Sequence, residues 1–258
     1  MNKDTITSLY NNVEELRMVH FDTIDMQHGI NDGGIWKIYN PTHFMYMYAF
    51  FNTLYAIDWE VSMENGEMIS QPEKTSERTK ISQMLSFCFT DPSFKKKYKS
   101  DFIRIITNVF SSEKINRIID TIKPDATHSL GQIGENEKYS FKRNVFALLN
   151  GEFSTSIVYK IMEFIFLIRN NIFHGTKTLY TMLEPKQQTK LLLYSYFIIA
   201  VNQMLFSYLD YLYEKHTGKK VEEYNIDTLN KILKKLKANS QYAEIEDDED
   251  NYDDNDEI

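Results

Sequence analysis

The chain has 258 residues, of which 42% are hydrophobic and 26% charged, and its formal net charge is −8. This apolar content is enough for a large hydrophobic core and excludes a chain that is disordered throughout. With only 9 Gly and 5 Pro, collagen-like chains are excluded and turn-rich β-sandwiches and barrels are disfavoured. The single cysteine, Cys88, excludes an internal disulfide and a cysteine-based zinc site, and it is typical of the reducing cytoplasm.

Apolar residues recur every three or four positions over most of the chain, which predicts an all-α fold. A helical extension is expected over 1–39. Asn40-Pro41 then begins the next helix, since Asn is a good cap and Pro suits a first helical position. Only 61–70 suits a small β-hairpin. The main domain, residues 40–240, is expected to contain helices at about 40–55, 75–89, 100–110, 112–122 after a break at Ser111-Ser112, 141–150, 154–174, 184–216 and 226–238.

The longest apolar stretch, 191–209, is long enough to cross a membrane. Asn202 and Gln203 lie side by side near its middle, and isolated amides are costly in lipid. A helix that is buried in a protein bundle is therefore the better interpretation, and we expect no membrane partner.

Of the 37 acidic residues, ten lie between Glu244 and Glu257, so the rest of the chain carries 27 acidic and 29 basic residues. The acidic tail, residues 241–258, has no apolar period and is predicted to be disordered. The rest is nearly neutral, so the overall charge does not exclude a nucleic-acid partner. Three roles for the tail stay open: solubility, folding back over a basic RNA groove, and docking on a basic partner.

The segment FLIRNNIFHGTK, residues 166–177, carries the strongest chemical signal. Asn170 and His174 share a helix face, so the amide can fix the imidazole, while Arg169 can reach the same place with its long stem. A guanidinium, an amide and an imidazole suit a phosphodiester, because Arg holds phosphate oxygens and His moves protons near neutral pH. The alternative is ordinary helix-end chemistry, since cations and a following glycine, here Gly175, commonly end helices.

Arg169, Asn170 and His174 resemble the Arg-x4–6-His motif of the HEPN superfamily, in which a polar residue commonly follows the arginine. Their placement between two long helices is also similar to HEPN domains of prokaryotic defence systems. The resemblance covers about 40–215 and implies a helical bundle that forms a homodimer, or a higher homo-oligomer, with two motifs facing one cleft. It also implies a metal-independent endoribonuclease, in which an RNA 2′-hydroxyl attacks the adjacent phosphate and leaves a 2′,3′-cyclic phosphate. His174 would be the acid/base, Arg169 the phosphate clamp and Asn170 the orienting group.

Other residues are weaker candidates. Glu163 lies nearly on the face of Arg169, one and a half turns earlier, and can hold it, although a surface or interhelical salt bridge is the equal alternative. The histidines show no metal-ligand spacing and no phosphate-binding loop is present, so we expect neither a metal nor another cofactor. A further group of lysines can bind the RNA backbone or can simply form a solvated surface. This group consists of Lys95, Lys96, Lys97, Lys99 and Lys177.

These expectations describe a cytoplasmic endoribonuclease of the toxin or antiphage-defence type, for which an antitoxin is a possible partner. The competing interpretation is a non-catalytic HEPN module that only dimerises. A third is an accessory subunit of a defence complex, whose acidic tail recruits a protein partner.

Overall fold

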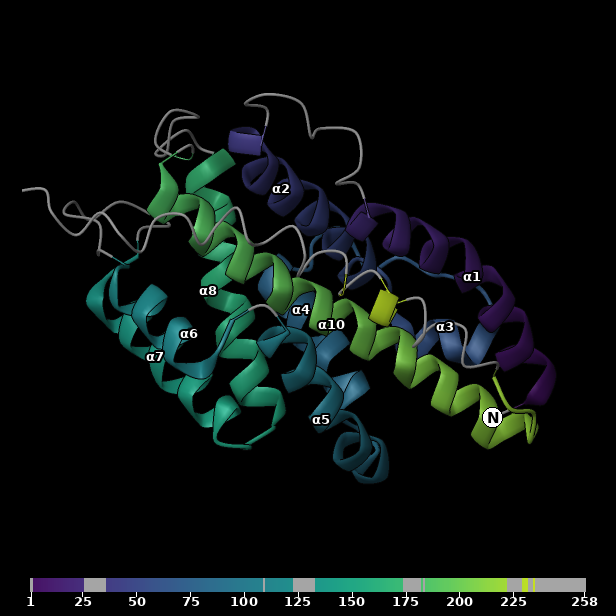
Figure 1. Ribbon diagram of the computed structural model, residues 1–258. Helices are drawn as coiled ribbons and strands as arrows, with labels where there is room; N and C mark the ends of the chain where they lie inside the picture. The colour runs from purple at the N-terminus through teal and green to yellow at the C-terminus, as the bar shows by residue number, and fades with distance from the viewer. Residues whose placement is uncertain are drawn as a thin grey trace, which may run out of the picture.

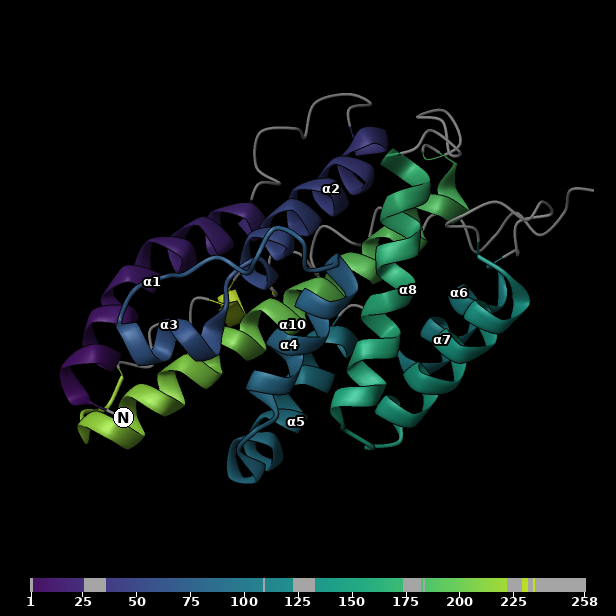
Figure 2. The same ribbon diagram turned by 180° about the vertical axis from the view of Figure 1, so that it is seen from behind.

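The computed structural model describes residues 2–25, 36–108, 110–122, 133–173, 182, 184–221, 229–231 and 234. Within these residues the protein consists of helices and loops, and the pairing of Ile57 with Ser70 is an isolated bridge. The all-α prediction is therefore confirmed. The helices, shown in Figures 1 and 2, are α1 (Lys3–Asp25), α2 (Trp36–Tyr55), α3 (Trp59–Asn65), α4 (Glu77–Cys88), α5 (Pro92–Thr107), α6 (Ser112–Asp120), α7 (Glu135–Leu149), α8 (Thr155–Phe173) and α10 (Pro185–Thr217).

The longest helix, α10, forms the centre of the fold. It runs diagonally through the molecule in Figure 1 and contacts α1, α2, α5, α6 and α8. Its segment Lys186–Thr217 is long and apolar enough to cross a membrane, but 94% of the most apolar window is buried inside the protein. Asn202 and Gln203 are only 0% and 2% exposed. This burial agrees with the prediction of a core helix.

Polar caps determine where several helices begin. Ser76 and Ser111 each accept a hydrogen bond from a backbone amide three residues later, so α4 and α6 begin close to where the sequence predicts. Asp91 caps α5 and Pro92 occupies its first turn, so this helix begins eight residues earlier than the expected 100–110. The first turn of α7 is polar, so the apolar period did not reveal it, and in α5 the lysines between Phe94 and Tyr98 obscured the period.

The prediction of a hairpin at 61–70 is wrong, because residues 61–65 belong to the short helix α3 and Ser70 pairs with Ile57 in an isolated bridge. The carboxylate of Asp58 accepts a hydrogen bond from the backbone amide of Val61 and caps the first turn. Gly66 ends the helix with φ +79°, in the left-handed region that glycine adopts without steric cost.

The prediction that a helix begins at Asn40-Pro41 is also wrong, because α2 already begins at Trp36. Pro41 lies inside α2, where it removes one backbone hydrogen bond without ending the helix. The predicted boundary at residue 40 therefore falls within a helix. The N-terminal helix α1 packs against α2, α3 and α10, and Ile6 and Leu9 belong to the same hydrophobic core as the rest of the bundle.

Two predicted segments, the basic helix at 226–238 and the acidic tail, lie wholly or mostly outside the described residues. Residues 123–132, between the helices expected at 112–122 and 141–150, also lie outside them. Of the basic helix, residues 229–231 are described as helical, and Leu229 is buried with 3% exposure.

A buried ion pair joins α1 to α10. Arg17 is 1% exposed, and its Nη1 lies 2.5 Å from Oδ1 of Asp210. The hydroxyl of Tyr10 donates to the same oxygen at 3.1 Å, and the Tyr10 ring centre lies 4.6 Å from the guanidinium carbon. Because water does not reach Arg17, loss of the carboxylate would leave a buried positive charge without compensation.

We expect Asp210→Asn to lower the free energy of unfolding by about 3 kcal/mol, because the buried guanidinium loses its counter-charge. Glu14→Gln is the matched control, since Glu14 is half exposed and lies 3.8 Å from Nε of Arg17, and it should cost less than about 1 kcal/mol. Urea unfolding followed by circular dichroism measures both variants. Equal losses in the two would contradict the buried pair.

His20 is fully buried on α1 among aromatic rings. The ring centres of Phe21, Phe50 and Phe206 lie 5.3 to 5.8 Å from the imidazole centre. Within the described residues, neither ring nitrogen has a hydrogen-bond partner. Burial lowers the pKa of His20 to about 3, so the imidazole stays neutral in the folded protein near neutral pH.

This burial predicts a loss of stability in mild acid. A histidine in the unfolded chain has a pKa of about 6.5, so the unfolded state binds the proton first and stability falls below that pH. His20 alone should make the free energy of unfolding about 1.4 kcal/mol lower at about pH 5.5 than at about pH 7.5. In His20→Leu that part of the difference should vanish, whereas the part from His43, whose pKa burial lowers to about 4, should remain. Urea unfolding at both pH values checks this, and an unchanged pH dependence in the variant would refute it.

Candidate functional site

The candidate site lies at the C-terminal end of α8. One face of this helix is buried as the sequence predicts, and the other is only partly covered. Arg169 stands on the partly covered side, with its side chain 22% exposed, four residues before the last helical residue, Phe173. Its guanidinium therefore lies at the edge of the core, neither sealed inside nor free in solvent.

Arg169 is fixed by contacts with three helices. Its Nη1 donates to Oδ1 of Asn170 at 2.9 Å and to Oε2 of Glu77 on α4 at 3.4 Å. The guanidinium carbon lies 5.3 Å from the ring centre of Tyr48 on α2 and 4.7 Å from that of Phe173, which are cation–π distances. Of the guanidinium nitrogens, only Nε is buried without a hydrogen-bond partner in the described part of the chain.

Tyr55 of α2 supports Glu77 from the other side. Its hydroxyl donates to Oε1 of Glu77 at 2.8 Å, so the two carboxylate oxygens have different partners. Burial, followed by nearby Tyr48 and the hydrogen bond to Glu77, raises the pKa of Tyr55 well above its ordinary value, so the phenol remains a donor at neutral pH. A chain of polar contacts thus joins α2, α4 and α8 and ends at Arg169.

The sequence did not reveal the partners of Arg169. Glu77 follows the Ser76 cap, and an acid in the first turn of a helix interacts favourably with the helix dipole without any further partner. Arg169 is 92 residues away in the chain. Tyr48 and Tyr55 belong to an apolar stripe, which indicates burial but no polar contact.

His174, Gly175 and Lys177 lie outside the described residues. His174 is bonded to Phe173, whose ring contacts the guanidinium of Arg169. Within the described residues, the oxygen of the Asn170 amide is bound to Arg169. The convergence of Asn170 and Arg169 with His174 stays a prediction.

Glu163 does not contact Arg169, whose acidic partner is Glu77. The Glu163 carboxylate lies 2.7 Å from Nζ of Lys160 on α8 and 3.8 Å from Nη1 of Arg78 on α4. Of the two predicted roles, the structure therefore supports the interhelical salt bridge. The direct hold on Arg169 is wrong, because six residues along a helix separate two side chains by about 9 Å.

The lysines at 95–99 lie on α5, away from Arg169. Their side chains are exposed or half-buried, whereas the neighbouring Phe94 and Tyr98 are 3% and 4% exposed, so these rings are not available to stack on RNA bases. Lys99 lies beside Gly151, in the turn before α8. Arg169 stands 14 residues after the start of α8 at Thr155, which is about 21 Å along the helix. Figure 2 likewise shows α5 near the opposite end of α8.

Metal and thiol chemistry find little support in the described part of the chain. No group of three or more His, Cys, Asp and Glu side chains there is close enough to hold a metal ion. Cys88 is buried on α4, and burial raises the pKa of its thiol above the ordinary value, which disfavours a reactive thiolate.

No family model, curated protein or solved structure matches the chain. The resemblance to HEPN domains therefore rests on the motif residues and on their place at the end of a long helix.

The Glu77 contact predicts a measurable effect on stability. Glu77→Ala should lower the free energy of unfolding by about 1.5 kcal/mol, because Arg169 loses a carboxylate and Tyr55 loses its acceptor. Glu77→Gln retains an acceptor for Tyr55 and should cost less. Glu73→Ala, at an exposed position just before α4, should stay within about 0.5 kcal/mol of the parent protein. Urea unfolding compares the three, and a Glu77→Ala protein as stable as Glu73→Ala would refute the contact.

Proposed function

We propose that the protein is a cytoplasmic, metal-independent endoribonuclease of the HEPN type, acting as a toxin or in antiphage defence. The proposal rests on how the guanidinium of Arg169 is held and on how far it is exposed. Its guanidinium is oriented by Glu77 and Asn170 and held between the rings of Tyr48 and Phe173, yet its side chain is still 22% exposed. A guanidinium held in place at a surface is suited to bind a phosphate.

The chemistry follows from the residue types. Arg169 binds the non-bridging oxygens of a phosphodiester and stabilises the negative charge that develops on them. His174 removes the proton from the RNA 2′-hydroxyl or donates one to the leaving 5′-oxygen, because its ordinary pKa is close to neutral. The products are a 2′,3′-cyclic phosphate and a free 5′-hydroxyl.

A homodimer fits the surface around Arg169. The side chain of Phe173 is 57% exposed, and Phe166, one helical turn before Arg169, is partly exposed on α8. Exposed aromatic side chains in line with a charged group are typical of protein interfaces. A two-fold contact along this face of α8 would bring two copies of Arg169 to one cleft.

The second candidate is a non-catalytic dimerisation module or accessory subunit. The contact with Glu77 favours it, because a carboxylate at 3.4 Å lowers the attraction of the guanidinium for phosphate. In that case Arg169 joins α8 to α4 and α2 and has no substrate.

The purified full-length chain, incubated with total cellular RNA and EDTA, should produce fragments that end in 2′,3′-cyclic phosphates. His174→Ala and Arg169→Lys should each reduce the rate at least about 100-fold, since lysine keeps the charge but loses the planar fork. The rate of RNA cleavage is followed by gel electrophoresis and the ends by enzymatic repair.

Arg104→Lys is the control, because Arg104 is half exposed and pairs with Asp101 of the same helix at 3.1 Å. Its rate should equal that of the parent protein. Circular dichroism and light scattering confirm that each variant is folded and has the same oligomeric state. Parent protein that leaves RNA intact while forming the dimer would favour the non-catalytic module, and cleavage that survives in His174→Ala would refute the mechanism.

A further inference from the structure

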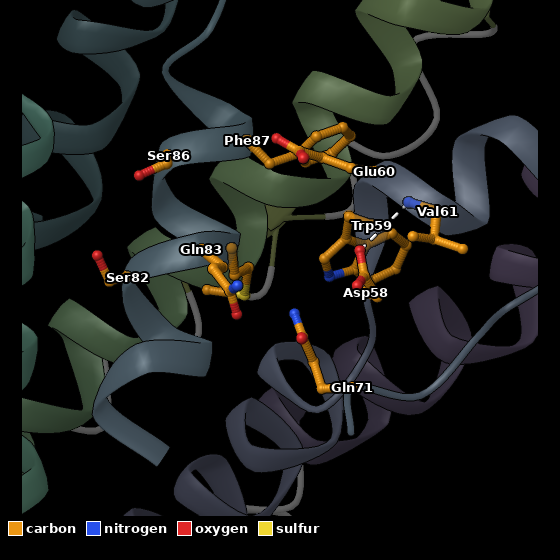
Figure 3. A pocket seen from close by; sticks show the side chains of 10 residues that line it. Asp58, Trp59, Glu60, Val61, Gln71, Ser82, Gln83, Ser86 and Phe87 are labelled. Atoms are coloured by element: carbon orange, nitrogen blue, oxygen red, sulfur yellow. Dashed lines mark hydrogen bonds between the residues drawn. The ribbon is translucent and has the colours of Figure 1, made fainter. Parts of the chain in front are cut away.

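A polar pocket of about 190 Å³ lies between α3 and α4. It is lined by residues 58–61 at the start of α3, by Gln71 in the loop that follows, and by residues 82–84, 86 and 87 of α4, as Figure 3 shows. None of the residues that surround Arg169 belongs to this lining. The pocket is therefore separate from the candidate nuclease site.

Gln71 is a buried residue whose amide points into the pocket. It is 7% exposed, and its backbone amide donates to the carbonyl of Ala56. Its side chain has no hydrogen bond with any residue that the structure describes, and in Figure 3 it projects toward Gln83 and Asp58. The polar atoms of this amide are not among the buried side-chain atoms that lack a partner, so they are open to the pocket and can be bound by a ligand.

The lining is negatively charged. Asp58 and Glu60 contribute two carboxylates, and no Lys or Arg is among the lining residues. Oδ1 of Asp58 accepts from the backbone amide of Val61 at 3.2 Å, which leaves its other oxygen for a ligand. A cation is therefore attracted to the pocket, and a phosphate-bearing ligand is repelled.

The apolar part of the lining comes from two aromatic residues. The rings of Trp59 and Phe87 are stacked, with centres 6.4 Å apart and planes 19° apart. The Trp59 indole nitrogen donates to the carbonyl of Leu54 at 2.9 Å, so its donor is already used. Trp59 is 2% and Phe87 7% exposed, so neither presents a free π face, and the small exposed part of each gives the pocket an apolar wall for an aliphatic stem. A bare metal ion requires a closer cage of oxygens.

We propose that this pocket binds a small aliphatic polyamine, such as 1,4-diaminobutane or spermidine. The carboxylates of Asp58 and Glu60 pair with ammonium groups, and the amide oxygen of Gln71 accepts from one of them. The methylene stem lies against Trp59 and Phe87. This site does not depend on the nuclease proposal.

The test must separate the pocket from the acidic tail, which also attracts polyamines. Trp59 emission in the full-length chain, with Trp36→Phe to remove the other tryptophan, reports on the pocket alone. Titration with 1,4-diaminobutane and spermidine at low ionic strength should give saturable changes, with spermidine the tighter ligand. The uncharged isostere 1,4-butanediol should give none.

Gln71→Met is the decisive variant, because it removes the amide without changing the charge of the pocket or the tail. It should weaken binding by about tenfold, and so should Asp58→Asn, which retains the helix cap but loses the carboxylate. Glu64→Gln removes the same charge from α3 outside the pocket and should leave the affinity unchanged. Circular dichroism verifies that each variant is folded.

Three results would overturn the proposal. The first is the absence of a saturable change in Trp59 emission with either amine. The second is parent-like affinity in both Gln71→Met and Asp58→Asn. The third is an equal response to magnesium chloride at equal concentration, which would identify a divalent-cation site instead.

Discussion

The fold depends on the need to cover α10. Residues 191–200 of this helix are all buried, which leaves no face for water along almost three turns. Such a helix is stable only if neighbours surround it, and α1, α2 and α5 make the most extensive contacts with it. The helices α4 and α8 also contact α10, so α2, α4 and α8 are brought together around it. Arg169, Glu77 and Tyr55 meet where these three helices come together.

The long helices α8 and α10 could be predicted from the sequence because each is a long and strongly apolar stretch. The expected segments 154–174 and 184–216 agree with α8 and α10 to within one residue at each end. Short or polar segments carried less information. The helix α3 has only 7 residues, which is about two turns, and its caps at Asp58 and Gly66 define it better than its apolar residues do.

Only part of the candidate site could be predicted from the sequence. Arg169 could be found because Asn170 and His174 accompany it in the motif. Glu77 and Tyr55 lie near Arg169 through tertiary contacts that no local pattern encodes. The sequence around the lysines at 95–99 could have been interpreted better. Phe94, Tyr98 and Phe102 recur every four residues, which is the spacing of a buried stripe and explains why two of these rings are turned away from the lysines beside them.

The contact between Glu77 and Arg169 lowers the attraction of the guanidinium for phosphate, but it leaves part of the guanidinium available for an anion. A guanidinium has five N–H donors, and Glu77 and Asn170 both bind at Nη1. Nη2 donates to neither of them, so an incoming phosphate can bind this edge while the other stays held. An arginine that is held on one edge loses less side-chain entropy when it binds an anion on the other, which is the advantage of preorganisation. Glu77 therefore lowers the net positive charge of the site around the guanidinium but fixes the direction of the guanidinium. The balance between these two effects separates a phosphate clamp from a structural link between helices.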